Sequence, residues 1–265
     1  MSIRKILFVF MLSAVWSGAF SQDYDVYLWI GQSNCAGRGP MTANDTTEVL
    51  DGVMLLNADG QPEPAVAPLN RYSNIRKSDM SMQMLGPAWQ FAKDMYKANG
   101  RKILLVQNAR GGSWMQTWQV GGDGKDSYAD SAIVRARQAL RYGQLKGIMW
   151  HQGCTDVQKG THREIYVERF TKMMRYLREQ LGAGTDVPVI VGEIPQWAWA
   201  DQQEIAIFND STLDVITQTV PNCHKVESDG LVRRYDDNVG DPHFSRDSYI
   251  ELGHRYATEL QHMQE

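Results

Sequence analysis

Runs of apolar residues alternate with stretches of helical periodicity along most of this chain. Short runs rich in β-branched and aromatic residues predict five buried strands, and amphipathic periodicity predicts helices between and after them. The strands are expected at 24–30, 102–108, 146–152, 187–194 and near 223–228, and the helices at 86–100, 127–143, 163–182, 202–220 and 245–263. Such alternation predicts an α/β fold, in which helices cover both faces of a parallel sheet.

Residues that commonly begin or end helices bound these segments. Gly100, Gly143 and Gly182 each close one helix, and Ser245 is a suitable N-cap for the last. No linker rich in Gly or Pro divides the pattern. The loop-rich stretch 38–82 therefore predicts an insertion or rim rather than a second domain.

The first residues predict an export signal. Arg4 and Lys5 precede the apolar run ILFVFMLSAVWSGAF, and Ala19 and Ser21 are the small residues that a signal peptidase reads. A membrane anchor is the alternative, but the run is shorter than the roughly 20 residues that a span needs. We expect cleavage of 1–21, a single domain over 22–265, a periplasmic or extracellular location, and no membrane partner afterwards.

Composition narrows the partner classes. Without the two basic residues of the signal, 25 basic and 31 acidic residues remain, which gives a net charge of −6. No basic stripe is visible, so nucleic acid is not an expected partner. Three cysteines (Cys35, Cys154 and Cys223) are too few for a disulfide scaffold; either one pair forms after export or all three are buried thiols.

Polar residues that could bind a ligand or take part in a reaction follow three of the predicted strands. The sequence GQSN at 31–34 follows the first, NARGGSWMQTW begins at 108, and HQGCTD spans 151–156. Ligands bind at the carboxyl ends of parallel strands, so these segments predict a site. Ser33 is either part of a tight turn or a nucleophile, and a serine nucleophile needs a base oriented by a carboxylate.

The best base among the six histidines is His243. It lies in the loop segment GDPHFS, two residues after Asp241, and the pair is either an orienting Asp–His pair or an ordinary capping loop. The other histidines lie on predicted helices (His162, His254 and His262) or at strand ends (His151 and His224).

Acyl transfer also needs donors for a developing oxyanion. The N–H of Ser33, the backbone of Gly111 and Gly112, and the side-chain amide of Gln152 are candidates, although each segment alone could be structural. The chain has no G-x-S-x-G, P-loop, H-E-x-x-H or G-x-G-x-x-G motif. Cys35 or Cys154 as a nucleophile lacks a base nearby in sequence.

Four segments, in order, resemble the motif blocks of the SGNH hydrolases. They are GQSNCAGRG, GGSWMQTW, WHQGCTD and GDPHFSRDSYIELGHRYA. The chain is most similar to the branch that contains sialate O-acetylesterases and the acetylxylan esterases of carbohydrate esterase family six. The resemblance implies a three-layer α/β/α sandwich with a flavodoxin-like parallel sheet. It also implies Ser33 as nucleophile, His243 as general base, the donors above as oxyanion hole, and no metal or organic cofactor.

Three departures from the family pattern stand out. Cys35 replaces a frequent Met, and Cys154 replaces the Glu of HQGESD. The family Asp usually lies three residues before the His, where this chain has Gly240. Asp241 is our choice for the orienting carboxylate, with Asp237 or a Ser–His dyad in reserve. The fold implied by the resemblance also makes a Cys35–Cys154 bond geometrically reasonable.

Tryptophans near the same edge suggest a sugar-binding cleft. Trp114 and Trp118 follow the glycine pair, and Trp197 and Trp199 follow the 187–194 strand, where they either stack on sugars or pack the rim. We expect an exported serine esterase that removes O-acetyl groups from glycans of the acetylxylan or O-acetyl sialic acid type. A glycan-binding protein without catalysis and an SGNH lipase acting on other esters are the alternatives.

Overall fold

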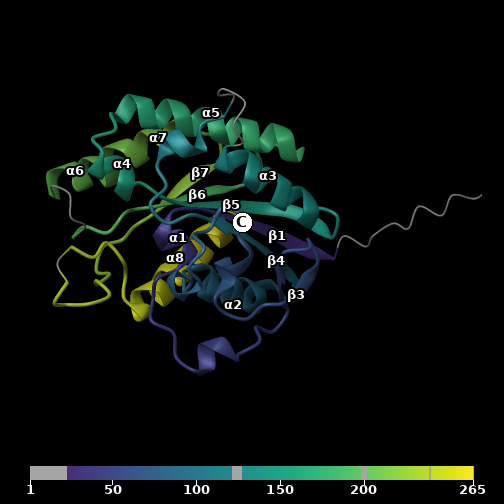
Figure 1. The fold of residues 1–265 in the computed structure, drawn as a ribbon. Helices are drawn as coiled ribbons and strands as arrows, with labels where there is room; N and C mark the ends of the chain where they lie inside the picture. The colour runs from purple at the N-terminus through teal and green to yellow at the C-terminus, as the bar shows by residue number, and fades with distance from the viewer. Residues whose placement is uncertain (1–22, 121–126, 198–201, 239, 265) are drawn as a thin grey trace, which may run out of the picture.

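A seven-stranded sheet forms the centre of the protein (Figure 1), with strand order β3-β2-β4-β1-β5-β6-β7. The structure is a computed structural model that describes residues 23–120, 127–197, 202–238 and 240–264. The predicted signal segment and Trp199 lie outside the described residues. The strands are β1 (Tyr24–Gly31), β2 (Val53–Leu56), β3 (Pro62–Pro64), β4 (Ile103–Ala109), β5 (Gly143–His151), β6 (Val189–Gly192) and β7 (Cys223–Val226).

The sheet is parallel except at one edge, where β3 pairs antiparallel with β2. The five strands expected from the sequence form the order β4-β1-β5-β6-β7, which is the 2-1-3-4-5 order of flavodoxin-like folds. The expected three-layer α/β/α architecture is confirmed. After β1 the chain builds one side of the sheet and then the other, so the switch in strand order lies beside β1.

Helices cover both faces of the sheet. In Figure 1, α3, α5 and α7 lie on one side and α2 and α8 on the other. The helices are α1 (Ser33–Ala36), α2 (Ala88–Asn99), α3 (Tyr128–Ala139), α4 (Cys154–Gln158), α5 (Arg163–Leu181), α6 (Gln202–Ala206), α7 (Leu213–Thr219) and α8 (Arg246–Gln264). A π-helical turn over Ile207–Thr212 joins α6 to α7 inside the segment that periodicity predicted as one helix.

Alternate residues of the central strands supply two hydrophobic cores. Val26 and Leu28 of β1 pack with α3 and α5, whereas Tyr27 and Trp29 pack with α2 and α8. All four side chains are buried. Burial on both faces explains why these strands read as continuous apolar runs.

Two sequence-based boundaries were wrong. The second predicted helix, which corresponds to α3, begins with a capping box between Ser127 and Asp130 but ends at Ala139. Gly143 begins β5 instead of closing that helix, and a Cβ there would collide with the Tyr24 carbonyl of β1. The glycine therefore allows close strand pairing rather than a helix end.

The stretch 38–82 contains more structure than its composition suggested. It includes the β2–β3 hairpin and three short 3₁₀ helices, at Asn44–Thr46, Leu69–Tyr72 and Met80–Met82. The hairpin extends the sheet at its edge. None of the described helices is both long enough and apolar enough to cross a membrane.

Candidate active site

The turn after β1 is forced by close approach to β5. Gly31 has φ of 142°, and a Cβ on it would collide with the carbonyl oxygen of His151. The next amide, that of Gln32, donates to the same carbonyl at 2.9 Å. Ser33 follows as the first residue of α1, at the carboxyl edge of the sheet. The sharp turn is therefore what lifts this serine out of the strand.

The structure brings Ser33 and His243 together across 210 residues of sequence. His243 Nε2 lies 3.0 Å from Ser33 Oγ. The histidine belongs to the loop between β7 and α8, and its side chain is 18% exposed. Ser33 is itself 7% exposed, so the pair is sheltered yet open on one side.

Asp241 is hydrogen-bonded to His243, although it lies two residues before the histidine and not the usual three. One carboxylate oxygen, Oδ1, bonds His243 Nδ1 and also accepts the His243 backbone N–H at 3.2 Å. The other oxygen, Oδ2, accepts from Arg234 Nε at 2.8 Å. A spacing of two residues thus lets the carboxylate fold back on its own loop, whereas Asp237 is exposed. Arg234, which holds the second oxygen, was missed by sequence reasoning.

Two hydrogen bonds hold the loop that carries His243, and a third holds the side chain of one of the donors. Asn34 Nδ2 donates to the carbonyl of Pro242 at 3.0 Å, and its own Oδ1 accepts from Tyr249 OH at 2.6 Å. Trp197 Nε1 donates to the carbonyl of Asp241 at 3.2 Å. Asn34 follows Ser33 directly, so one short turn carries the serine and anchors the histidine loop.

Burial lowers the pKa of His243 to about 4. The carboxylate of Asp241 acts in the opposite direction, and the guanidinium groups of Arg38 and Arg234 add to the lowering. The imidazole is therefore neutral at neutral pH. With its Nδ1 bonded to Asp241, the neutral ring presents Nε2 to Ser33 as an acceptor.

The backbone of the glycine pair lies beside Ser33. The position of a Cβ on Gly111 is 3.5 Å from Ser33 Cβ. Within the described part of the chain, the amides of Gly111 and Gly112 donate to no other residue. The Ser33 N–H stands at the amino end of α1, where first-turn amides have no partner inside the helix.

Gln152 differs from the expectation. Its side chain is fully buried, and its Nε2 donates to the Ser113 carbonyl at 3.1 Å and to Asp156. Its Oε1 accepts from Tyr166 OH at 2.9 Å. Both amide hydrogens therefore already have protein acceptors. The competing acceptor is Asp156, four residues further on and also buried, a pairing that the sequence motif did not reveal.

The four tryptophans separate into different environments. Trp118 is fully buried and donates to Ser113 Oγ at 3.0 Å, so it is a core residue and not a cleft residue. Trp114 and Trp197 are half-buried. Lys159 Nζ lies 4.8 Å from the centre of the Trp114 ring. Trp199 lies outside the described residues.

The cysteines do not offer another nucleophile. Cys35, Cys154 and Cys223 are free and buried, so the Cys35–Cys154 pairing is not formed. Burial raises the pKa of the Cys35 thiol and raises that of Cys154 to about 12. A thiol that stays protonated at neutral pH is a poor nucleophile.

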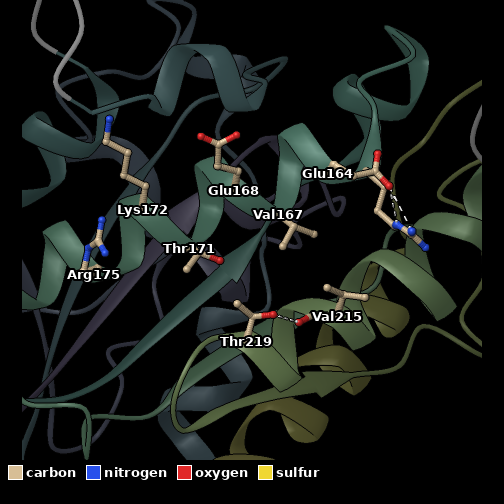
Figure 2. A pocket seen from close by; sticks show the side chains of 9 residues that line it. Glu164, Val167, Glu168, Thr171, Lys172, Arg175, Val215 and Thr219 are labelled. Carbon is tan, nitrogen blue, oxygen red and sulfur yellow. Dashed lines mark hydrogen bonds and ion pairs between the residues drawn. The ribbon is translucent and has the colours of Figure 1, made fainter.

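A hollow elsewhere on the protein is not lined by Ser33 or His243. This hollow, of about 530 Å³, lies between α5 and α7, and Figure 2 shows Val167 and Thr171 opposite Val215 and Thr219. Over the described ranges, no three His, Cys, Asp or Glu side chains cluster closely enough to hold a metal ion.

Comparison with known proteins places the chain in a family. Residues 23–262 match the family model described as "Carbohydrate esterase, sialic acid-specific acetylesterase". A probable carbohydrate esterase of Arabidopsis thaliana is 26% identical over 183 residues, which cover 62% of this chain. That alignment spans 66% of the plant protein's own length, slightly less than two thirds.

Solved structures share the fold. An Arabidopsis thaliana protein has a TM-score of 0.74 at 20% identity, over 91% of this chain and 98% of the other. NanS has a TM-score of 0.66 at 17% identity, over 92% and 98%. A carbohydrate acetylesterase from Xanthomonas citri has a TM-score of 0.63 at 18% identity, over 90% of this chain and 56% of that one.

Proposed function

Because this chain belongs to the carbohydrate esterase family of sialic acid-specific acetylesterases, we propose that it is a serine esterase that removes O-acetyl groups from carbohydrates. The observation that carries the proposal is the row of hydrogen bonds from Ser33 Oγ through His243 to Asp241. A neutral imidazole that faces a hydroxyl and is oriented by a carboxylate is the arrangement that serine acyl transfer requires.

In the proposed reaction, Ser33 Oγ attacks the acetyl carbonyl while His243 Nε2 takes its proton. Asp241 holds the ring and stabilises the imidazolium that forms. The bond between the acetyl carbon and the sugar oxygen then breaks, and His243 returns its proton to that oxygen. Water, deprotonated by His243, then attacks the acetyl-serine. The bond between the acetyl carbon and Ser33 Oγ breaks, acetate leaves, and His243 returns the proton to Ser33 Oγ.

Backbone amides are the proposed donors to the oxyanion. Within the described ranges, the amides of Ser33, Gly111 and Gly112 donate to no other residue, and Gly111 lies beside Ser33. Two such donors beside a nearly buried serine are the groups that an oxyanion hole for acyl transfer requires. The chemistry in this scheme is supplied by side chains and backbone of the chain itself.

The proposed substrates are O-acetylated glycans of the sialic acid or xylan type. The family description supports an acetylated sugar acid, and the half-buried rings of Trp114 and Trp197 offer apolar surface for a sugar face. We also propose that the protein is exported, which suits a glycan substrate outside the cytoplasm. Sequencing the amino terminus of protein recovered from the periplasm or medium tests export, with Gln22 as the expected first residue.

Acetate release from a panel of esters tests the function. The panel contains O-acetylated sialic acids, acetylated xylo-oligosaccharides and a chain-length series of p-nitrophenyl esters, with Ser33→Ala as the control. We expect Ser33-dependent release of acetate from at least one sugar ester and a decline with longer acyl chains. Binding of the glycans without any turnover would indicate a glycan-binding protein, and preference for long chains a lipase.

A further inference from the structure

Arg38 is a buried cation with almost no protein partner. Arg38 lies two residues after the end of α1 and is 6% exposed. Its Nη1 donates to the Gly37 carbonyl at 2.6 Å. Among the described residues, no carboxylate pairs with it and no group accepts from its Nε or Nη2. The other buried arginines, Arg135 and Arg178, each donate to two carbonyls, but the Nε of each is buried without a partner. A buried guanidinium with no carboxylate partner is costly. The Nε and Nη2 of Arg38 are not among the buried nitrogens that lack a partner, so they keep contact with solvent and can meet a ligand.

The free end of this guanidinium lies next to the candidate nucleophile. A Cβ on Gly111 would lie 2.6 Å from Arg38 Nη2 and 3.5 Å from Ser33 Cβ. The guanidinium and the serine therefore flank the same small space. Gly111 is not among the glycines with positive φ, and the atom that its Cβ would meet is the flexible end of Arg38.

The expected third donor to an oxyanion, Gln152, already uses its amide hydrogens within the protein. Both amide hydrogens of Gln152 are taken by Ser113 and Asp156, so Gln152 has none left for a substrate. Arg38, by contrast, has unused N–H groups and a positive charge beside Ser33. The same charge acts on His243 and disfavours its protonation. The pocket is therefore electropositive where an acetyl oxygen would become negative.

We propose that Arg38 is a catalytic residue that donates an Nη2–H hydrogen bond to the acetyl oxygen in the transition state. The inference rests on the esterase function proposed above and replaces Gln152 with Arg38 in the oxyanion hole. A charged donor in a sheltered pocket interacts more strongly with an oxyanion than with a neutral carbonyl. Arg38 then lowers the barrier to reaction and contributes little to binding of the ester.

The test compares Arg38→Met and Arg38→Lys with wild type on p-nitrophenyl acetate, on a neutral acetylated xylo-oligosaccharide and on an acidic O-acetylated sialic acid. For Arg38→Met we expect kcat to fall roughly 10²–10³-fold, the loss typical of one missing oxyanion donor, with KM little changed. Arg38→Lys keeps the charge and is expected to retain part of the rate. Guanidinium chloride at millimolar concentration should partly rescue Arg38→Ala, which no purely structural role predicts.

Thermal unfolding of each variant separates catalysis from folding. Removal of an unpaired buried charge is expected to leave the melting temperature of Arg38→Met unchanged or raised. A kcat within threefold of wild type, or a loss of folding in both Arg38→Met and Arg38→Lys, overturns the proposal. So does a loss confined to the KM of acidic sugar esters, which would make Arg38 a receptor for a carboxylate. Wild type without Ser33-dependent turnover overturns the esterase function itself, whereas an active wild type with active Arg38 variants overturns only the role of Arg38.

Discussion

At the scale of single residues, His243 is the group whose protonation decides activity. Burial and two nearby guanidinium groups lower its pKa, and only Asp241 opposes them. Because the base must be neutral, activity should fall only as the pH drops through this lowered pKa. We expect the acid limb of kcat/KM to have its midpoint below the usual histidine value of about 6.5. Rates on a neutral acetyl ester between about pH 4 and 8 measure it, and a midpoint at or above 6.5 contradicts the prediction.

Two aspartates in the same loop allow the orienting role to be tested with a matched control. Asp241 is buried against His243 and Arg234, whereas Asp237 is exposed. Asp241→Asn is expected to lower kcat by roughly 10³–10⁴-fold, because the ring loses its correct tautomer. Asp237→Asn should leave kcat within twofold of wild type. Equal effects of the two substitutions, or none from Asp241→Asn, would favour a Ser–His dyad.

At the scale of elements, the turn between β1 and α1 depends on a glycine. Gly31→Ala meets both a positive φ and the carbonyl of His151 on β5. We expect it to lower the free energy of unfolding by on the order of 3 kcal/mol or more. Gly100→Ala is the matched control, since φ is 66° there and nothing lies within 4 Å of the Cβ position.

Urea unfolding of both variants provides the measurement. The control carries only the backbone cost of a left-handed residue, roughly 1–2 kcal/mol. A Gly31→Ala loss no larger than that of Gly100→Ala would show that β1 and β5 separate easily at this turn. The turn at Gly31 would then contribute less to the position of Ser33 than the structure indicates.

The elements that sequence predicts well are those whose burial is local and periodic. β1 and β4 read as continuous apolar runs because helices cover both faces, and α5 shows its stripe over five turns. The β2–β3 hairpin was missed because it has four apolar residues followed by a proline-bounded edge strand. Edge strands need few buried residues, so their pattern is weak.

The site residues also differ in how far the sequence predicts their roles. Ser33 follows the end of a strand, and His243 lies in a short polar loop. The topology of a parallel sheet therefore predicts that they lie close together at its carboxyl edge. Gln152 shares that position, yet its hydrogen bonds are set by Asp156 and Ser113, whose placement depends on tertiary packing. The partner of Asp241, Arg234, is likewise invisible until the loop is folded.

At the scale of the whole molecule, the site joins the first and last parts of the sheet. The turn after β1 supplies Ser33, and the loop before α8 supplies His243. That loop is tied to three separate elements. Asn34 of α1 donates to the Pro242 carbonyl, Tyr249 of α8 packs against the Phe244 ring, and Trp197 after β6 donates to the Asp241 carbonyl. Its position is therefore a consequence of the assembled fold and not of local sequence.

This arrangement predicts that activity survives until the entire fold is lost. In urea, we expect the midpoint for loss of esterase activity to coincide with the midpoint for loss of secondary structure, measured by circular dichroism, in the wild-type protein. The reason is that hydrogen bonds and ring contacts hold the His243 loop to the rest of the fold. Trp197→Phe keeps an aromatic ring against Phe244 but removes the N–H that holds the Asp241 carbonyl. That variant should lose activity at lower urea than it loses secondary structure. If wild type already loses activity first, the loop is an independent unit, and the ties to Asn34 and Tyr249 are weaker than their geometry suggests.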